Sequence, residues 1–397
     1  MRKYYTEQEM TQDFSKLFVS KEVQRALSDL GIVKPTSIQE KTIPLMMDGQ
    51  DIIAIAPTGT GKTIAFGIPM LEYIDLKSSD LQELVLAPTR ELAMQIYEEI
   101  KSLAKYIKNV RIALIYGGQP IKKQVGKLRK KPHIVIATPG RLLDMIYRKH
   151  ISINRIHTMV IDEADEMFNM GFIEDVKKIL DMTPEEKQTV MFSATTNQDV
   201  LTVSWHYQYK PVEVVVQAEK EDKPKIKQYA IRAPYRKKAD YILYLFDSNE
   251  YKRAMVFVNT KFMAEKLCAM LQKSGYDAKA LHGDIRQKQR TYIMNGFKQG
   301  KFPILVCTDV AARGIDVYDV DIVINYDLPN ENEYYLHRIG RTGRAKKEGE
   351  AFTLLTFQES VKMDEIIRYM GSSPEKLHFD DFGILLKEDG EPFFKSI

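Results

Sequence analysis

The sequence is poor in cysteine and lacks long apolar runs. Its two cysteines, Cys268 and Cys307, are far apart and lie in apolar surroundings, which excludes a disulfide scaffold and predicts reduced core thiols. No apolar run approaches the ~18 residues of a membrane span. The opening residues, MRKYYTEQEM, also lack the apolar core of a signal peptide. We therefore expect no membrane association and a cytoplasmic location.

The sequence also lacks a large excess of positive or negative charge, and it lacks the residue spacing of a metal site. The net charge is only +4, which allows a polyanionic partner without arguing for one. The seven histidines show neither the H-E-x-x-H pattern nor a Cys/His spacing, so no structural metal is predicted.

What the sequence does contain is a repeated alternation of short apolar runs and amphipathic stretches. A length of 397 residues favours two domains. Continuous apolar strands joined by helical stretches are typical of α/β domains, with a mostly parallel sheet and helices on both faces. The expected strands are residues 51–56, 83–88, 111–117, 133–138, 157–162, 189–194, 254–259, 302–308, 321–327 and 350–356, and a long helix is expected over 90–107.

The segment AEKEDKP, residues 218–224, interrupts this alternation and is typical of a surface linker. It predicts a first domain over 1–217 and a second over 225–397. From 361 to 397 the chain has five Lys/Arg against eight Asp/Glu. We therefore expect the second domain to end in a short acidic tail.

A glycine-rich turn, APTGTGKT, lies between an expected strand and an expected helix. Backbone N–H groups in such a turn cradle phosphate, and the helix dipole favours negative charge. An incidental glycine turn is the alternative, which the strand-to-helix context disfavours. Ala56 replaces the first glycine of the general pattern, and Pro57 follows it. The predicted nucleotide-binding residues here are Thr58, Gly59, Thr60, Gly61, Lys62 and Thr63.

Four carboxylates follow the expected strand 157–162, in the sequence VIDEADEMF. A surface strand end is one interpretation, but the phosphate-type loop favours a Mg²⁺ site held by Asp162 together with Thr63. Glu163 is then placed to polarise the attacking water. Asp165 is expected to connect to a neighbouring motif or domain, and Glu166 to be solvated.

Together these segments resemble the DEAD-box RNA helicase family, which is named after residues 162–165. The resemblance covers nearly the whole chain. The other segments, in the family's order, are GIVKPTSIQ (31–39), PTREL (88–92), Gly117–Gly118, TPGR (138–141), SAT (193–195), VFVNT (256–260), QKQR (287–290), TDVAARGID (308–316) and HRIGRTGR (337–344).

The resemblance implies two tandem RecA-like domains that use ATP and Mg²⁺. The 31–39 segment, preceded by Phe14, resembles the motif that recognises adenine, and the Gln39 amide suits the base edge. Asp316 would contact the ribose. The implied RNA contacts are Pro88, Thr89, Arg90, Gly118, Thr138, Arg141, Arg290 and Thr308.

The HRIGRTGR segment gathers cationic residues between glycines. Arginines suit phosphate because the planar guanidinium offers paired donors, although a basic surface loop is the alternative. In the family the last two arginines act from the second domain on nucleotide held by the first. This implies catalytic roles for Arg341 and Arg344, and His337 of the same segment is also predicted to be catalytic. Arg338 lies between these residues.

The implied activity is RNA-dependent ATP hydrolysis with local unwinding of short duplexes. Binding of single-stranded and short double-stranded RNA is expected to be independent of sequence, by a monomer. An ATP-gated RNA clamp and a DNA translocase are the rival hypotheses, and ribosome or RNA-decay partners are left open. Two further features have alternatives. The basic stretch 121–131 is interpreted as a solvated helix face, with direct RNA contact as the alternative. The region around Trp205 is interpreted as a packed helix-to-strand corner, with a base-stacking platform as the alternative.

Overall fold

The chain divides into two compact units, Met1–Glu219 and Lys220–Ile397. The computed structural model describes residues 13–17, 19–57, 59–216, 225–248, 251–312, 320–343, 348–380 and 383–394. The expected linker, 218–224, lies outside these residues. Among the described residues no helix combines the length and the apolar content that a bilayer crossing requires.

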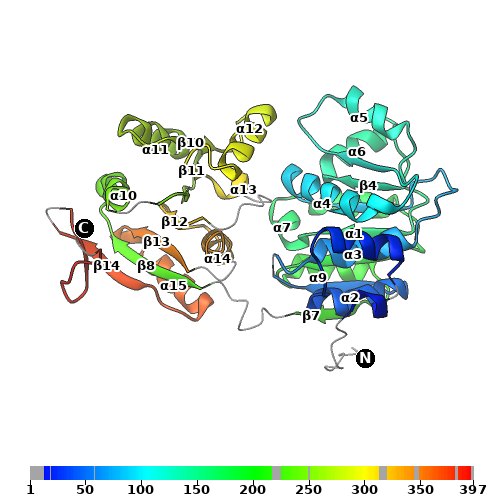
Figure 1. The fold of residues 1–397 in the computed structure, drawn as a ribbon, viewed down its shortest axis with the longest axis horizontal. Helices are drawn as coiled ribbons and strands as arrows, with labels where there is room; N and C mark the ends of the chain where they lie inside the picture. The colour runs from blue at the N-terminus through cyan, green and yellow to red at the C-terminus, as the bar shows by residue number, and fades with distance from the viewer. Residues whose placement is uncertain are drawn as a thin grey trace. The chain divides into compact units, whose positions relative to one another are not determined.

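The first unit alternates strands and helices along the chain (Figure 1). Its elements are η1 (Phe14–Leu17), α1 (Lys21–Asp29), α2 (Ser37–Met47), β1 (Ile52–Ile55), α3 (Lys62–Glu72), β2 (Glu83–Leu86), α4 (Arg90–Leu103), η2 (Ala104–Tyr106), β3 (Ile112–Ile115), α5 (Ile121–Leu128), β4 (Ile134–Ala137), α6 (Pro139–Tyr147), β5 (Thr158–Ile161), α7 (Ala164–Asn169), α8 (Ile173–Asp181), β6 (Gln188–Ser193), α9 (Gln198–Tyr207) and β7 (Val212–Val215).

The sheet of this unit has the strand order β3-β4-β2-β5-β6-β1-β7, and its strand pairs are parallel. Successive strand residues enter two separate hydrophobic clusters. Val85, for example, packs in one cluster with Phe66 of α3, and Leu86 packs in the other with Leu142 of α6. Because side chains alternate across a strand, the two clusters cover opposite faces of the sheet. The expected doubly covered parallel sheet is confirmed.

This strand order divides the carboxyl edge of the sheet into two halves. The loops after β1, β5 and β6 carry the glycine-rich turn, the acidic segment and the SAT segment. The loops after β2, β3 and β4 carry the residues that resemble RNA contacts. The halves meet where β2 pairs with β5, with Leu86 beside Ile161. Ligands of open α/β sheets bind at this carboxyl edge.

The second unit repeats the architecture. Its elements are β8 (Ile226–Arg232), η3 (Tyr235–Lys237), α10 (Lys238–Asp247), β9 (Ala254–Phe257), α11 (Lys261–Lys273), β10 (Ala278–Leu281), α12 (Gln287–Lys298), β11 (Ile304–Cys307), α13 (Asp309–Ala312), β12 (Ile322–Asn325), α14 (Asn332–Ile339), β13 (Gly349–Leu355), η4 (Phe357–Glu359), α15 (Ser360–Met370), β14 (Glu375–Phe379) and β15 (Leu385–Lys387).

The sheet of the second unit has the order β10-β11-β9-β12-β13-β8-β14-β15, parallel except for the last pair. Two hydrophobic clusters again cover its faces. Part of the segment predicted as a short acidic tail packs on this sheet: β14 pairs with β8, and the ring of Phe393 lies 4.7 Å from that of Tyr229. Aromatic side chains spaced between the acidic residues attach this segment to the core.

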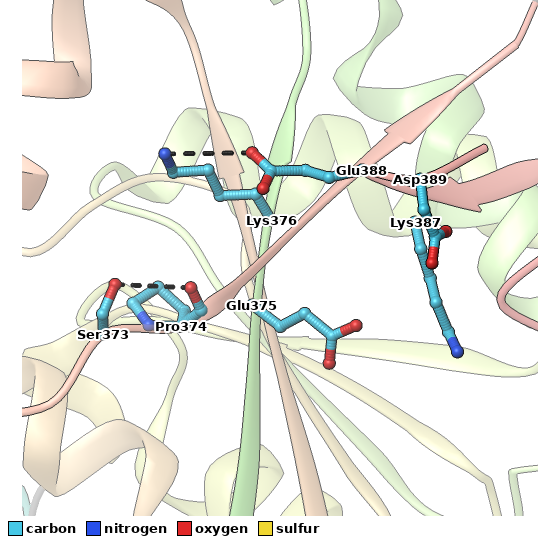
Figure 2. A pocket seen from close by; sticks show the side chains of 7 residues that line it. All are labelled: Ser373, Pro374, Glu375, Lys376, Lys387, Glu388 and Asp389. Atoms are coloured by element: carbon cyan, nitrogen blue, oxygen red, sulfur yellow. Dashed lines mark hydrogen bonds and ion pairs between the residues drawn. The ribbon is translucent and has the colours of Figure 1, made fainter. Parts of the chain in front are cut away.

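Charged side chains occupy the outer hairpin of this sheet. Figure 2 shows a shallow hollow beside β14 and β15, where Lys376 and Glu388 form an ion pair at 3.9 Å. Both side chains are largely exposed. Charges on an outer strand oppose pairing with another chain, and none of the predicted site residues lines this hollow.

Expected strand positions agree closely with the structure, with shifts of one or two residues at the ends. The expected helix over 90–107 is α4 followed by η2. Both cysteines are buried and unpaired, as predicted. The packed corner at Trp205 is wrong, since Trp205 is 67% exposed and Tyr209 is 77% exposed. An aromatic run without helical or strand periodicity gave no indication of which rings face the core.

One carboxyl group lies in the core of the first unit. Glu83 begins β2, is fully buried, and neither of its oxygens accepts a hydrogen bond of ordinary geometry from the described residues. Burial raises the pKa of Glu83 well above its usual range, and the neighbouring Thr158 side chain offsets this only in part. The folded protein therefore retains a proton that the unfolded chain releases.

Replacing this group by an amide tests the consequence. Because the folded pKa of Glu83 is raised, its contribution to stability is greatest below the ordinary carboxyl pKa and declines as the pH rises toward the folded value. Relative to wild type, Glu83→Gln should therefore become increasingly stable as the pH rises above the ordinary carboxyl pKa, because the amide has no proton to lose.

The measurement is urea unfolding at several pH values for wild type and Glu83→Gln. Glu186→Gln changes an exposed carboxyl group in the same unit and is the matched control, with no pH-dependent difference expected. A stability difference for Glu83→Gln that does not vary with pH would contradict the buried-proton explanation.

Candidate functional site

The glycine-rich loop leads from β1 into α3. Gly59 and Gly61 have φ values of 81° and 88°, in the left-handed region that glycine tolerates without steric cost. Gly61 is the N-cap of α3, so Lys62 and Thr63 lie in the first helical turn, both buried. Backbone N–H groups and the helix dipole make this turn suited to anions. Thr58 lies outside the described residues.

Gln39 of α2 clasps this loop. Its Nε2 donates to the Gly61 carbonyl at 3.1 Å, and its Oε1 accepts from the Thr36 backbone N–H at 3.0 Å. The Thr36 hydroxyl in turn donates to the Thr60 carbonyl at 2.8 Å. A Cβ at position 61 would lie 2.3 Å from Gln39 Nε2, so this position requires glycine for space as well as for φ.

The hydrogen bonds of Gln39 to Thr36 and Gly61 determine which of its amide groups remain for the expected contact with adenine. Gln39 is 1% exposed and uses one donor and one acceptor within the protein, which leaves its second N–H and further lone pairs. Phe14 of η1 is 4% exposed and packs in the hydrophobic cluster that contains Phe66. Adenine recognition by these two residues stays a prediction.

A buried ion pair joins the glycine-rich loop to the acidic segment. Lys62 Nζ lies 2.7 Å from Glu163 Oε1 and 3.5 Å from the Ala56 carbonyl oxygen. Glu163 has φ 50° and ψ 54°, a left-handed conformation that costs a non-glycine residue ~1–2 kcal/mol. This conformation lets the Glu163 backbone N–H donate to Asp162 Oδ1 at 3.0 Å. The strained turn thus directs two neighbouring carboxylates toward one place.

Burial controls the ionisation of this group. Asp162 is 2% exposed, and burial raises its pKa to about 7, with Lys62 opposing the increase and Glu163 adding to it. Burial alone lowers the pKa of Lys62, but the nearby carboxylates, Glu163 first, raise it more, so the net shift is upward. Lys62 is therefore charged and is the cation that these carboxylates share.

The residues present fit a magnesium ion. Asp162 is a buried carboxylate that shares the single charge of Lys62 with Glu163, so a further cation would favour its ionised form. The hydroxyl of Thr63 lies at the start of α3, where a phosphate oxygen would be held. Hard oxygen donors of this kind, completed by phosphate and water, are the ligands that Mg²⁺ prefers.

Asp165 connects the acidic segment to the SAT segment, as expected. Its Oδ2 accepts from the backbone N–H groups of Ala194 and Thr195, at 3.1 and 2.8 Å, and from the Thr195 hydroxyl at 2.9 Å. The expectation for Glu166 is wrong, because this side chain is 8% exposed and not solvated. It lies on the inner side of the short helix α7, which the acidic composition did not reveal.

The other half of the edge presents two helix N-termini. Thr89 caps α4, with its hydroxyl accepting from the Leu92 N–H at 3.2 Å, and Thr138 precedes α6. Both threonines are buried, and Pro88 is also buried beside Thr89. Helix N-termini after adjacent strands, β2 and β4, suit the phosphates of a nucleic-acid backbone.

Arginines and a glycine pair complete this half. Gly118 has φ 85°, and the Arg90 guanidinium lies so close that a Cβ at 118 would meet Nη1 at 2.4 Å. Arg141 donates from Nη1 to the Gln119 carbonyl at 3.0 Å. The structure thus gathers Arg90, Gly118 and Arg141 around the loop that follows β3.

The second-unit residues fall into two groups. Arg290 and Thr308 are both buried, and Arg290 Nη2 donates to the Ala311 carbonyl at 2.6 Å. Arg338 is 1% exposed and binds both oxygens of Asp309 at 2.6 Å. The interpretation of Arg338 as a phosphate-type arginine is therefore wrong: it holds α14 to the loop after β11.

The predicted catalytic residues of this unit are only partly described. His337 and Arg341 are both half-buried, at the end of α14 and just after it. Arg344 and Asp316 lie outside the described residues. Their roles stay predictions.

Comparison with known proteins agrees with this arrangement. Residues 36–203 match the DEAD/DEAH box helicase family, and residues 237–346 match the helicase conserved C-terminal domain. The first match contains the glycine-rich loop, the acidic segment and the SAT segment. The second contains most of the second-unit segments described above.

Curated relatives extend the similarity to nearly the whole chain. The DEAD-box ATP-dependent RNA helicase CshA of Geobacillus kaustophilus is 44% identical over 364 residues, which cover 92% of this chain and 78% of that protein. The protein of the same name from Bacillus subtilis is 43% identical, over 90% of this chain and 72% of that one.

Solved structures show the same fold. Saccharomyces cerevisiae Dbp5 bound to RNA and ADP BeF3 is 29% identical with a TM-score of 0.84, covering 94% of this chain and 97% of that one. A DEAD box protein from Methanococcus jannaschii is 40% identical with a TM-score of 0.53, covering 92% and 99%. Similarity of this extent and identity shows the family, and the chain belongs to the DEAD-box ATP-dependent RNA helicases.

Proposed function

We propose that the chain hydrolyses ATP when it binds RNA and uses this cycle to separate short RNA duplexes locally. The observation that carries the proposal is the divided carboxyl edge of the first sheet. Phosphate-type and metal-type groups follow β1 and β5, while helix N-termini and arginines suited to an RNA backbone follow β2, β3 and β4. The two halves share the β2–β5 pair, so each lies close to the other.

The nucleotide half supplies positioning and charge. Lys62 takes the terminal phosphates, and a phosphate there competes with Glu163 for the same ammonium group. Nucleotide binding therefore releases Glu163 from its ion pair and leaves its carboxylate to orient and polarise the attacking water. Asp162 and Thr63 would hold Mg²⁺, which when bound neutralises charge on the phosphate oxygens.

The RNA half of the edge, which consists of the loops after β2, β3 and β4, is proposed to bind the sugar-phosphate backbone and not the bases. Thr89, Thr138, Arg90 and Arg141 offer helix N-termini and guanidinium groups, which recognise phosphate and carry no sequence information. We therefore propose sequence-independent binding of single-stranded and short double-stranded RNA. Arg290 and Thr308 are the proposed contacts of the second unit.

The remaining roles are proposed from family membership. Arg341 and Arg344, with His337, complete hydrolysis by acting on nucleotide held in the first unit, and Asp316 contacts the ribose. The chain is proposed to consist of domains 1–217 and 225–397 that are joined by the linker 218–224. We propose that it acts as a monomer and that it is located in the cytoplasm. Two unpaired buried thiols support a reducing compartment of this kind.

Gln39 links base recognition to the phosphate loop. Gln39→Ala removes the bonds to Gly61 and Thr36, so we expect all nucleotides to bind ~10-fold more weakly. If the amide also reads adenine, the preference of wild type for ATP over GTP should narrow in the variant. The measurement is the dissociation constant for both nucleotides.

Gln24→Ala is the matched control, because this amide binds the Val19 carbonyl near α1 and does not contact the loop. Equal binding of ATP and GTP by wild type would exclude adenine recognition, whereas the general loss of affinity tests the clasp separately.

Glu163 is expected to act on water. Glu163→Gln retains size and hydrogen bonding but loses the negative charge, so hydrolysis should fall by ~10²–10⁴-fold while ATP and RNA still bind. Asp162→Asn should instead weaken nucleotide binding in the presence of Mg²⁺. Phosphate release and nucleotide affinity are measured for both variants.

If Glu163→Gln instead lost nucleotide binding and Asp162→Asn retained it, Glu163 would be assigned to the metal and Asp162 to the attacking water. Stimulation of wild type by DNA as strong as by matched RNA would favour the DNA translocase hypothesis.

Arg341 is expected to act only when RNA is bound. A trans-acting arginine contributes ~10³–10⁵ in rate in related phosphoryl-transfer enzymes, so Arg341→Ala should abolish the stimulation by RNA and leave nucleotide binding unchanged. Arg368→Ala removes an exposed arginine of α15 in the same unit and should behave as wild type. The measurement is phosphate release with and without single-stranded RNA.

A wild-type rate that does not depend on RNA, or an Arg341→Ala variant that RNA still stimulates, would show that the site is completed in another way.

A further inference from the structure

Positive charge is concentrated in one segment of the first unit. From Ile100 to Leu143 the sequence has no aspartate or glutamate, although the whole chain contains 54 of them. The same segment has eleven lysines and arginines out of 58. With a net charge of only +4 for the whole chain, the remainder is therefore net acidic. Such an asymmetry indicates where a polyanion would be attracted.

The cations gather on the outer surface of α5 and the turn that follows it. All six are exposed: Lys122, Lys123, Lys127, Arg129, Lys130 and Lys131. Among the residues that the structure describes, Lys131 Nζ contacts the Ser79 hydroxyl at 3.4 Å, and no carboxylate forms an ion pair with any of the six. This group, called here the α5 basic face, has its charge available.

The α5 basic face is fixed to the loop that contacts Arg90. Gln124, 1% exposed, points inward from α5, and its amide brackets the Tyr116 backbone: Oε1 accepts from the N–H at 3.1 Å and Nε2 donates to the carbonyl at 2.9 Å. Leu128 anchors the other end of the helix in the core. Gly117 and Gly118 follow Tyr116 directly, so the cations are held at a constant place relative to this glycine pair.

Spacing along α5 produces a continuous stripe. Lys123 and Lys127 are four residues apart on α5 and therefore lie on one side of the helix, and Lys130 follows in the turn after it, where its N–H donates to the Lys127 carbonyl at 3.1 Å. Lys122 and Gly126 are also four residues apart on α5, and Arg129 is the C-cap of the helix. A Cβ at Gly126 would meet nothing within 4 Å, yet alanine would favour the helix by ~1 kcal/mol. The glycine leaves the backbone open between two cations.

We propose that the α5 basic face binds the sugar-phosphate backbone of RNA beyond the segment held by Thr89, Thr138 and the glycine pair. The proposal rests on the proposed function and adds to it a second length of RNA, flanking the first. In sequence α5 follows β3 and the glycine pair, and β3 pairs with β4, whose following loop carries Thr138.

The composition of the surface favours RNA over an acidic protein. No large hydrophobic side chain is exposed between residues 100 and 143 among those described. Protein interfaces have aromatic and aliphatic anchors at their centres, whereas nucleic-acid surfaces are polar and strongly positive. Lysine and arginine without such anchors are what an unspecific backbone contact requires.

The test compares three proteins: wild type, a stripe variant and a control. The stripe variant is Lys123→Gln, Lys127→Gln and Lys130→Gln. The control is Lys21→Gln, Lys178→Gln and Lys273→Gln, three exposed lysines of α1, α8 and α11, which give the same net charge. Binding is measured, with a non-hydrolysable ATP analogue, to oligouridylates of about 8 and about 30 nucleotides over a range of salt concentrations.

For the long RNA we expect the stripe variant to bind ~10-fold more weakly than the control, with a salt slope lower by ~2, since each lost phosphate contact removes ~0.7. For the short RNA the two variants should agree, and circular dichroism should show both folded. Equal affinity and slope for the long RNA would overturn the proposal. Equal losses for both RNAs would also overturn it, by placing these lysines at the short segment.

The proposed function is judged apart from this result. It fails if neither RNA stimulates wild-type hydrolysis, whereas the α5 proposal fails if wild type is stimulated and the stripe variant binds long RNA as the control does.

Discussion

The buried ammonium group of Lys62 is the interaction on which the site depends. Carboxylates of Asp162, Glu163 and Asp165 all surround it closely enough to raise its pKa, and Glu163 binds it directly at 2.7 Å. Removing one partner of such a pair leaves an uncompensated buried charge, which typically costs ~3–5 kcal/mol. A phosphate can replace Glu163 on this cation without that cost, because it brings negative charge of its own. The ion pair therefore neutralises the buried ammonium group, and its exchange for a phosphate is the step proposed for nucleotide binding.

The parallel sheet explains why these groups meet. Loops that follow parallel strands lie at one edge, so segments more than 100 residues apart in sequence, such as Lys62 and Glu163, become neighbours. Strand order then decides which loops adjoin. Because β2 pairs with β5, the loop with Thr89 lies next to the loop with Asp162. Asp165 extends the connection by binding Thr195 after β6. The residues proposed to bind nucleotide and those proposed to bind RNA thus lie on the same edge of the sheet, on either side of the β2–β5 pair.

Much of this followed from sequence because apolar runs and glycine positions are local signals. The ten expected strands agree with the structure within two residues at each end, and the phosphate loop and the carboxylates after β5 were also predictable. The strands β7, β8, β10, β14 and β15 were not predicted. Burial of individual polar side chains was also not predictable. Glu166 and Arg338 are residue types that usually lie on the surface. Glu166 is buried because α7 packs with this side inward, and Arg338 is buried because it pairs with Asp309. The sequence did not predict β14 in the last segment, because this strand depends on pairing with β8, a contact remote in sequence.

The same distinction applies to the α5 basic face. From sequence alone its lysines were indistinguishable from any solvated helix surface, because exposure by itself indicates no partner. The added information is positional: Gln124 binds the Tyr116 backbone and thereby fixes the helix to the glycine pair that Arg90 contacts. A cation held at a fixed place beside a phosphate-type site loses little additional freedom on binding, whereas a cation on a mobile segment would have to be ordered first. The buried amide, and not the number of lysines, is therefore the feature that makes this surface suited to a backbone.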